Sequence, residues 1–285
     1  MDNSNIKDPL FRKAVDAIDA GDIISLQNLL EESPTLVNTR LDTRDEGYFK
    51  NPYLLWFVAD NPIRHEKLPA NICDVTRLII KFVKQNAPDS FHEQIEYTLG
   101  LVSTGRIPRQ SGVQIEWIDL LIDAGATPGN GIGALAHGNV DAARHLIERG
   151  GTLTLTTAIC LNRKEDIMRL SAEATKEDKQ IALMAAAFYG NPQMIEFLLN
   201  TGVDVNAYID GSSGFHSHAT ALHQAVFSGS LDSVKLLVHA GANPGLKDRV
   251  YDGTPLEWAS HMQTEEKDQA MNKKYEAIES YLTGR

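Results

Sequence analysis

Apolar side chains along this chain recur at intervals of three and four residues, a spacing that predicts amphipathic helices rather than strands. The first stretch of this kind has its apolar residues between positions 10 and 18, and it predicts a helix that ends at Gly21. Asp22 can cap a second helix over 23–30, because its carboxylate can accept hydrogen bonds from the free N–H groups of a helix start. A later helix is expected to carry Pro52 in its first turn, where proline is tolerated. The pattern therefore predicts helical hairpins along the chain.

One pattern of side chains occurs twice within residues 219–259, and its two copies are 34 positions apart. The matching residues are Thr220, Leu222, His223 and Ala225 in the first copy, and Thr254, Leu256, Glu257 and Ala259 in the second. An upstream stretch at 178–206 matches the first copy at a distance of 39 positions. A period in the low thirties with a Thr-Pro-Leu-His-x-Ala-like start is typical of ankyrin repeats, and the chain resembles that family.

The resemblance implies an all-α ankyrin-repeat solenoid of about seven to eight helical hairpin units with a few short β-hairpin fingers. It also implies a non-catalytic protein–protein interaction module, because the concave face and the fingers of this family normally bind another protein. Among its members, the chain is most similar to small stand-alone bacterial ankyrin-repeat proteins, whose individual roles are mostly undefined. The resemblance thus predicts binding of a protein or peptide and names no partner.

The repeat units are expected to form one array that departs from regularity in several places. Polar stretches at 39–51 and 62–69 enlarge the second unit. In the middle of the chain, the turns between paired helices near Gly138, Arg163 and Gly190 are only 25 and 27 positions apart, which leaves no room for fingers. The expected parts of the single array 1–285 are an N-terminal cap unit at 1–38, units with inserted loops at 39–128, compact middle units at 129–206, an extended finger with the most regular unit at 207–251, and a C-terminal cap unit at 252–285.

Composition narrows the classes of partner. The 285 residues include 38 acidic and 27 basic side chains, for a net charge of −11, and no clustered positive stretch of the kind that binds nucleic acid. This acidity favours a soluble monomer. Cys73 and Cys160 form no C-x-x-C pair, which argues against a zinc knuckle or a redox motif. The N-terminal stretch lacks the apolar region of a signal peptide, and no apolar run approaches the ~18 residues of a membrane span, so we expect a cytoplasmic protein without membrane contact.

Motifs for catalysis or cofactor binding are not found in the sequence. The glycines at 129–133 follow a helix end rather than a strand and lack the spacing of a dinucleotide fingerprint. No G-x-S-x-G nucleophile motif occurs, and the acidic residues are spread over expected helix surfaces as partners for lysine and arginine. We therefore expect no catalytic residues, no cofactor and no enzyme activity.

Three histidines lie close together in the extended finger and just after it. His216 and His218 could point to the same side, because alternate residues of an extended segment share a face. With His223 they form the alternative hypothesis, a metal or small-ligand site in the region 207–223, since zinc needs three or four such ligands. The competing interpretation is that His223 is the signature histidine of the family, which hydrogen-bonds backbone and steadies neighbouring units.

Arginine and aromatic residues, which often dominate binding energy at protein interfaces, gather in the expected loops and fingers. A basic, aromatic set in the first half of the chain would suit an acidic or C-terminal peptide segment, and it comprises Arg40, Arg44, Tyr48, Phe49, Lys50, Tyr53, Trp56, Arg64, His65, Arg106 and Arg109. The competing interpretation assigns Tyr53 and Trp56 mainly to the core. The partner-binding residues that we predict are Arg44, Tyr48, Phe49, Tyr53, Arg64, Arg106, Arg109, Tyr208, Phe215, His216, His218 and Tyr251.

Overall fold

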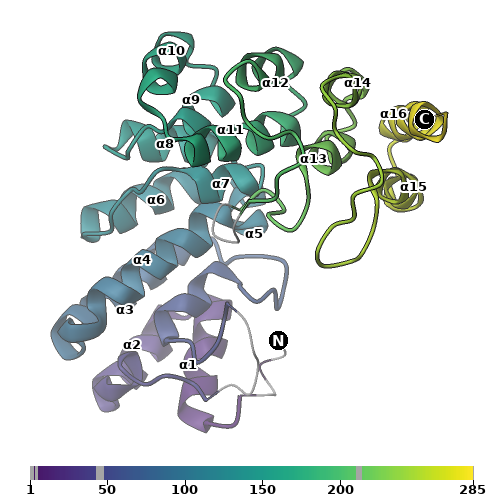
Figure 1. Cartoon of the computed structure of the whole chain (residues 1–285). Helices are drawn as coiled ribbons and strands as arrows, with labels where there is room; N and C mark the ends of the chain where they lie inside the picture. Colours follow the sequence, from purple (N-terminus) through teal and green to yellow (C-terminus); the bar gives the residue numbers. More distant parts are fainter. Residues whose placement is uncertain (1–2, 4–5, 43–47, 210–213, 285) are drawn as a thin grey trace. The chain divides into compact units, whose positions relative to one another are not determined.

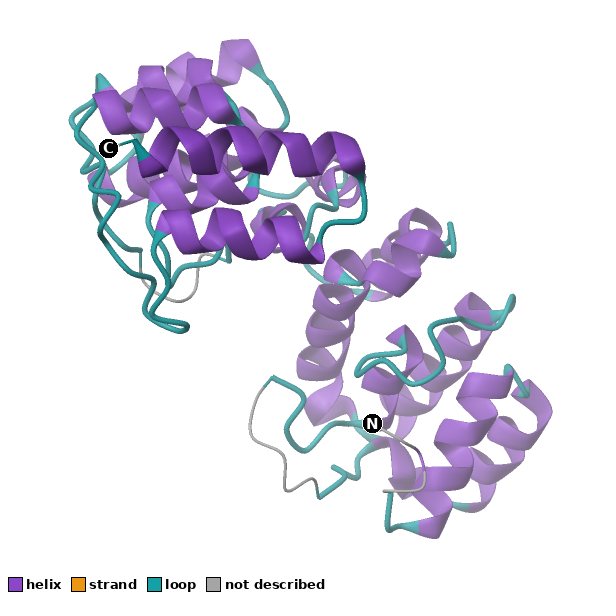
Figure 2. Ribbon diagram, turned by 90° about the vertical axis from the view of Figure 1, so that its right-hand side faces the viewer, coloured by secondary structure: helices purple, strands orange, loops and turns teal. Residues whose placement is uncertain are grey.

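The structure is a computed structural model and describes residues 3, 6–42, 48–209 and 214–284. Two compact units make up the chain, unit 1 at residues 1–152 and unit 2 at residues 153–285. Both consist of helices joined by loops (Figure 2), which confirms the predicted all-α class. The predicted β-hairpin fingers are not seen: the described residues contain no strand, and a single isolated antiparallel bridge joins Arg40 to Tyr53.

The helices of unit 1 whose bounds the structure describes are α-helices and short 3-10 helices. They are α1 (Pro9–Ala20), α2 (Ile23–Glu32), η2 (Pro34–Val37), η3 (Leu54–Ala59), α3 (Ile72–Asn86), α4 (Pro88–Thr104), α5 (Arg106–Gln110), α6 (Gln114–Ala124), α7 (Ile132–Ala136) and α8 (Val140–Glu148).

The helices of unit 1 form two stacked rows. One row runs α1, η3, α4, α7 and the other runs α2, α3, α6, α8, with each helix in contact with the next in its row (Figure 1). An apolar core lies between the rows. Its largest fully buried side chains are Phe11, Phe57 and Trp117. The two rows are what a stack of helical hairpins produces, because each hairpin can bury its apolar faces only against its neighbours.

Residues 52–62 differ from the sequence-based expectation. Pro52 does not lie in a first helical turn, because the helix begins at Leu54 and is the 3-10 helix η3. Asp60 ends η3 in the left-handed conformation, and Asn61 and Pro62 follow with a cis peptide bond. Every residue of η3 is buried, so this short segment takes the place that a longer helix would hold in the row.

The described residues of unit 2 form four consecutive helical hairpins. Its helices are α9 (Leu155–Cys160), α10 (Lys164–Glu173), α11 (Lys176–Phe188), α12 (Pro192–Leu199), α13 (Ala221–Phe227), α14 (Leu231–His239), α15 (Pro255–Glu265) and α16 (Gln269–Thr283).

The first helices of these hairpins pack side by side in the order α9, α11, α13, α15, while α12, α14 and α16 form a second row (Figure 1). Small side chains permit this close packing: α11 buries Ala182, Ala185, Ala186 and Ala187, which face neighbours on both sides. The core is closed toward the C-terminus by Tyr275 of α16, whose hydroxyl donates to the carbonyl of Phe227 at 3.0 Å.

Helix caps account for the side-chain pattern that repeats in the sequence. Thr254 and Glu257 at the start of α15 form a reciprocal capping box, in which each side chain accepts from the backbone N–H of the other. Thr220 and His223 hold the equivalent positions in α13, where the Thr220 N–H donates to His223 Nδ1 at 3.2 Å. The predicted cap Asp22 is confirmed as well, since it accepts from the Ser25 N–H at 3.0 Å.

Within the described residues, none of the helices combines the length and the apolar character needed to cross a membrane.

Candidate functional site

A groove of about 1130 Å³ lies along α4 in unit 1. Its walls are the second half of α4, helix α5, the end of η3 with residues 60–63, and the side chain of Tyr48. Three residues that the sequence predicted for partner binding line this α4 groove: Tyr48, Arg106 and Arg109.

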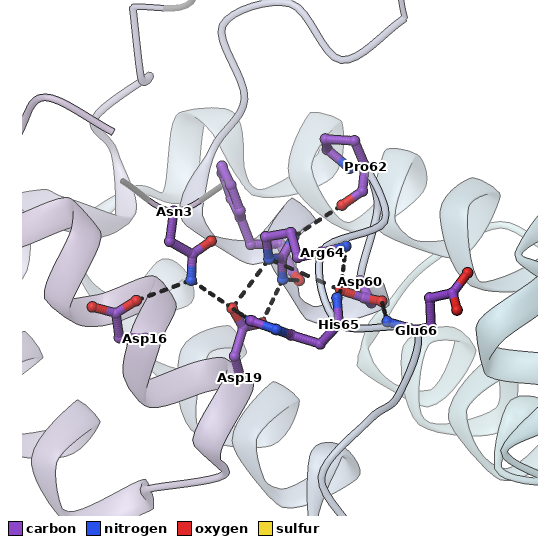
Figure 3. Close-up of polar contacts among 9 residues, drawn as sticks. Asn3, Asp16, Asp19, Asp60, Pro62, Arg64, His65 and Glu66 are labelled. Carbon is purple, nitrogen blue, oxygen red and sulfur yellow. Dashed lines mark hydrogen bonds and ion pairs between the residues drawn. The ribbon is translucent and has the colours of Figure 1, made fainter. Parts of the chain in front are cut away.

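One wall of the α4 groove is held by a buried arginine. Arg64 is only 1% exposed at its side chain and donates to Asp19 Oδ1 at 2.6 Å and to the Phe57 carbonyl at 2.7 Å (Figure 3). The guanidinium carbon of Arg64 also lies 5.2 Å from the centroid of the Phe57 ring, which adds a cation–π interaction. Loop 60–66 is thereby tied to α1, so that it presents a fixed edge to the groove.

The same loop is shaped by Asp60, a buried carboxylate. Oδ1 accepts the backbone N–H groups of Arg64 at 3.0 Å and His65 at 3.3 Å, and Oδ2 accepts that of Glu66 at 3.0 Å (Figure 3). The carboxylate thus satisfies three backbone N–H donors that would otherwise need water as a hydrogen-bond acceptor. The side chain of Ile63, 46% exposed, stands on this braced loop and lines the groove.

Aromatic side chains form another part of the groove wall. Tyr97 of α4 stacks on the buried Trp56 with ring centroids 4.1 Å apart, and its hydroxyl donates to the carbonyl of Tyr48. Burial raises the pKa of the Tyr97 phenol, and Tyr48 adds to this effect. Tyr48 itself is 67% exposed and donates from its hydroxyl to Asn61 Oδ1 at 2.8 Å. A large aromatic surface is thus fixed in place and open to solvent.

The two arginines of α5 differ in their partners. Arg106 pairs with Glu66 at 3.0 Å and also donates to Gln110. Arg109 donates to the Gly138 carbonyl at 3.1 Å and has no carboxylate within ion-pair distance among the described residues. Of these two arginines, Arg109 is therefore the one whose positive charge is less neutralised by a neighbouring carboxylate.

A second candidate surface is loop 248–253 of unit 2. Asp248 is buried and accepts the backbone N–H groups of Val250 at 2.9 Å, Tyr251 at 2.7 Å and Gly253 at 3.0 Å, together with the Trp258 indole N–H at 3.0 Å. Burial opposes ionisation of Asp248, but these donors outweigh it and lower the pKa of the carboxyl to about 2. The ionised side chain therefore fixes the loop.

Loop 248–253 presents two large apolar side chains to solvent. Val250 is 61% exposed and Tyr251 is 76% exposed. Their backbone is held by Asp248, so both side chains are presented from a defined backbone.

His223 connects this loop to α13. It is fully buried, its Nδ1 accepts from Thr220, and its Nε2 lies 3.0 Å from the Gly253 carbonyl. Burial lowers the pKa of the imidazole, partly offset by the Gly253 carbonyl and by Asp248. Both ring nitrogens of a neutral His223 thus take part in hydrogen bonds. This agrees with the interpretation of His223 as the signature histidine that hydrogen-bonds the backbone.

The alternative hypothesis of a metal site is not supported. Across 3, 6–42, 48–209 and 214–284, no group of three or more His, Cys, Asp or Glu side chains could hold a metal ion. His216 and His218 do lie near each other, with ring centroids 5.7 Å apart, but the nitrogens of His223 are already used. Residues 210–213, which belong to the same predicted ligand region, lie outside the described residues.

Other predicted partner-binding residues are placed in several environments. Arg44 lies outside the described residues. Tyr53 is buried against Trp56 and Arg40, as the core interpretation expected, and Phe49 is half-buried against Trp56. Arg64 is an interior residue, so it braces the groove without facing it.

In unit 2, Phe215 is buried against Phe188, and His216 and His218 are partly covered by aromatic rings. Tyr208 donates to the Lys247 carbonyl at 2.6 Å and packs under the guanidinium of Arg249. Of the predicted residues in this unit, Tyr251 is the most exposed.

The sequence-based list missed residues that shape both surfaces. Ile63 and Tyr97 line the α4 groove, and neither stood out because each fits an ordinary loop or helix pattern. Asp248 and Val250 had a usable signal, since an Asp that opens a short turn ending in Gly often accepts backbone N–H groups within that turn.

Comparisons with known proteins agree with the helical hairpins of this chain. Residues 132–248 match a family model described as ankyrin repeats (3 copies). The chain is also similar to "Ankyrin repeat and SOCS box protein 6" of Homo sapiens, with 37% identity over 79 residues. That similarity covers 28% of this chain and 18% of the human protein, so the chain matches less than a fifth of the relative's length.

Proposed function

This chain is an ankyrin-repeat protein, and on that premise we propose that it is a non-catalytic module that binds a partner protein through loop 248–253 and its surroundings. Ankyrin repeats are generally protein–protein interaction modules, which supports the class of function. The particular surface is supported by one observation: Val250 and Tyr251 are exposed on a loop whose backbone is fixed by Asp248.

The way in which the Val250 and Tyr251 side chains are held favours affinity for a partner. Large exposed side chains such as tyrosine are frequent binding hot spots, because they bury much apolar area when a partner covers them. A loop that is ordered before binding loses less conformational freedom on association, so more of that gain appears as affinity. Tyr251 on a loop fixed by four hydrogen bonds to one carboxylate meets both conditions.

The remaining expectations from composition stand as predictions beside this proposal. They are a cytoplasmic location, a monomeric state, and a partner that is neither nucleic acid nor membrane; a bacterial origin is what the resemblance to small bacterial ankyrin-repeat proteins implies. The net charge of −11 supports the exclusion of nucleic acid, because phosphate binding needs a positive surface.

The test compares proteins recovered from the native host with tagged wild type and with a Val250→Ser/Tyr251→Ala double variant. Any partner found is then purified, and its Kd is measured by calorimetry. We expect the double variant to bind at least about tenfold more weakly, since loss of one or two hot-spot side chains costs about 2 kcal/mol.

The matched control is Ile24→Ser/Met168→Ser, which removes two other exposed apolar side chains that are not part of the loop. This control should bind like wild type, and all three proteins should melt at similar temperatures. A partner that binds the loop variant as tightly as wild type, or no specific partner at all, would refute the proposal.

A further inference from the structure

The α4 groove combines apolar surface with a positive charge that has no acidic partner among the described residues. Ile63, Leu101 and Ile107 contribute aliphatic side chains to its lining, and Tyr48 adds an exposed ring. Its volume of about 1130 Å³ exceeds the roughly 300–1,000 Å³ of ordinary small-molecule pockets. The groove therefore has the size and the surface for a segment of polypeptide.

Arg109 supplies the polar element. Its guanidinium makes one hydrogen bond, to the Gly138 carbonyl, and takes part in none of the ion pairs found among the described residues. The neighbouring Arg106 is compensated by Glu66. On a chain with a net charge of −11, an exposed arginine that pairs with no described carboxylate provides charge complementarity for an acidic partner.

Two neighbouring hollows include Arg109 in their lining. It lines the α4 groove and also a neighbouring cavity of about 220 Å³ next to residues 138–141. A bound chain could therefore continue past the guanidinium. This favours the carboxylate of a side chain within a segment over a terminal carboxylate, where the chain would stop.

A single carboxylate fits the local charges better than a phosphate group. Recognition of phosphate on peptides typically uses a cluster of arginines. Among the described residues that line the groove, Arg109 has no second uncompensated arginine beside it, and Glu96 and Asp60 also line the groove. Their negative charges would oppose a dianion more than a monoanion.

We propose that the α4 groove binds an internal segment of a partner protein that places an apolar side chain against Ile63 and an Asp or Glu carboxylate on Arg109. The planar guanidinium can bind a carboxylate through two parallel N–H donors, which gives orientation as well as affinity. This site shares no residue with loop 248–253 and lies outside the residues matched by the family model, apart from His137.

The experiment begins with selection of random displayed peptides on the full chain. We expect enrichment of sequences with an apolar residue close to Asp or Glu. The best sequence is then made as a fluorescent peptide in four forms: with Glu, with Gln at that position, with an amidated C-terminus, and with phosphoserine in place of Glu. Binding is measured by anisotropy.

For wild type we expect the Gln peptide to bind about tenfold or more weakly than the Glu peptide, because a charge-assisted pair is lost. With Arg109→Gln, the Glu and Gln peptides should bind equally, so the two changes are not additive. Arg77→Gln is the matched control, an exposed arginine of the same unit that should leave the difference unchanged. Ile63→Asp, at an exposed position, should also weaken the Glu peptide by tenfold or more, which secures the test if Arg109→Gln folds poorly.

Several outcomes would overturn the inference. They are selection without acidic residues, an unchanged preference for Glu in Arg109→Gln, binding that requires a free C-terminus, and tighter binding of the phosphoserine form. The Val250→Ser/Tyr251→Ala variant should bind the peptide like wild type. If it loses the peptide, the segment binds at loop 248–253 and the α4 groove proposal fails while the proposed function stands.

Discussion

Nη2 of Arg64 lies 2.6 Å from Oδ1 of Asp19, a residue 45 positions earlier in the chain, and both side chains are almost excluded from solvent (Figure 3). The pair joins α1 to loop 60–66. It also turns an arginine that the sequence suggested for partner binding into a structural support of the α4 groove.

Replacing Arg64 by Met should destabilise the protein strongly. The variant leaves Asp19 without its main counter-charge in a buried site, and loss of one member of such a pair costs about 3–5 kcal/mol. The free energy of unfolding from urea denaturation checks this. Arg77→Met is the control, because Arg77 is exposed and its pairing with Asp74 should contribute less than about 1 kcal/mol. Equal losses in the two variants would show that the buried pair does not stabilise unit 1.

The carboxylate of Asp248 should make stability depend on pH in the acid range. Its pKa is lowered from 3.8 to about 2 in the folded protein, so its contribution is complete above the ordinary value and is lost as the pH falls through about 2. We expect wild type to lose about 2 kcal/mol more than Asp248→Asn between about pH 5 and pH 2.

Urea denaturation at a series of pH values measures this difference. Asp252→Asn is the matched control in the same loop, since Asp252 is exposed and pairs only with Lys247 at its side chain among the described residues. Its curve should follow that of wild type. A constant gap between wild type and Asp248→Asn at every pH would contradict the assignment of this carboxylate as ionised.

Gly190 should tolerate a side chain less well than Gly202. Both have positive φ, +60° and +82°, so alanine at either position pays a conformational cost of about 1–2 kcal/mol. A Cβ at Gly190 would also lie 2.9 Å from Ser228 and Ser230 of the next hairpin, whereas nothing lies within 4 Å at Gly202. We expect Gly190→Ala to lose about 1–3 kcal/mol more than Gly202→Ala in thermal or urea unfolding. Equal losses would mean that the neighbouring hairpin moves aside freely.

The irregular first half of the chain shows where prediction from sequence stopped. The hairpin of α1 and α2 and its Asp22 cap were predictable, because spacing and capping act over a few residues. Segment 52–62 was not: a helix start at Pro52 was expected, but Leu54 begins a 3-10 helix whose six residues are all buried by contacts with α1, α3 and α4. Such contacts come from distant parts of the chain, so they produce no recognisable spacing of apolar residues within the segment itself.

By itself, the sequence determined the helical hairpins, the cap residues and the repeat between Thr220 and Thr254, because each depends on interactions within a turn or two of helix. Only the tertiary structure decided that Arg64 is buried on Asp19 while Arg109 lies on the α4 groove without an acidic partner among the described residues. Both arginines lie within two residues of a preceding proline and look alike in the sequence. Their different roles follow from which carboxylates and which solvent-filled space the packed helices bring next to each one.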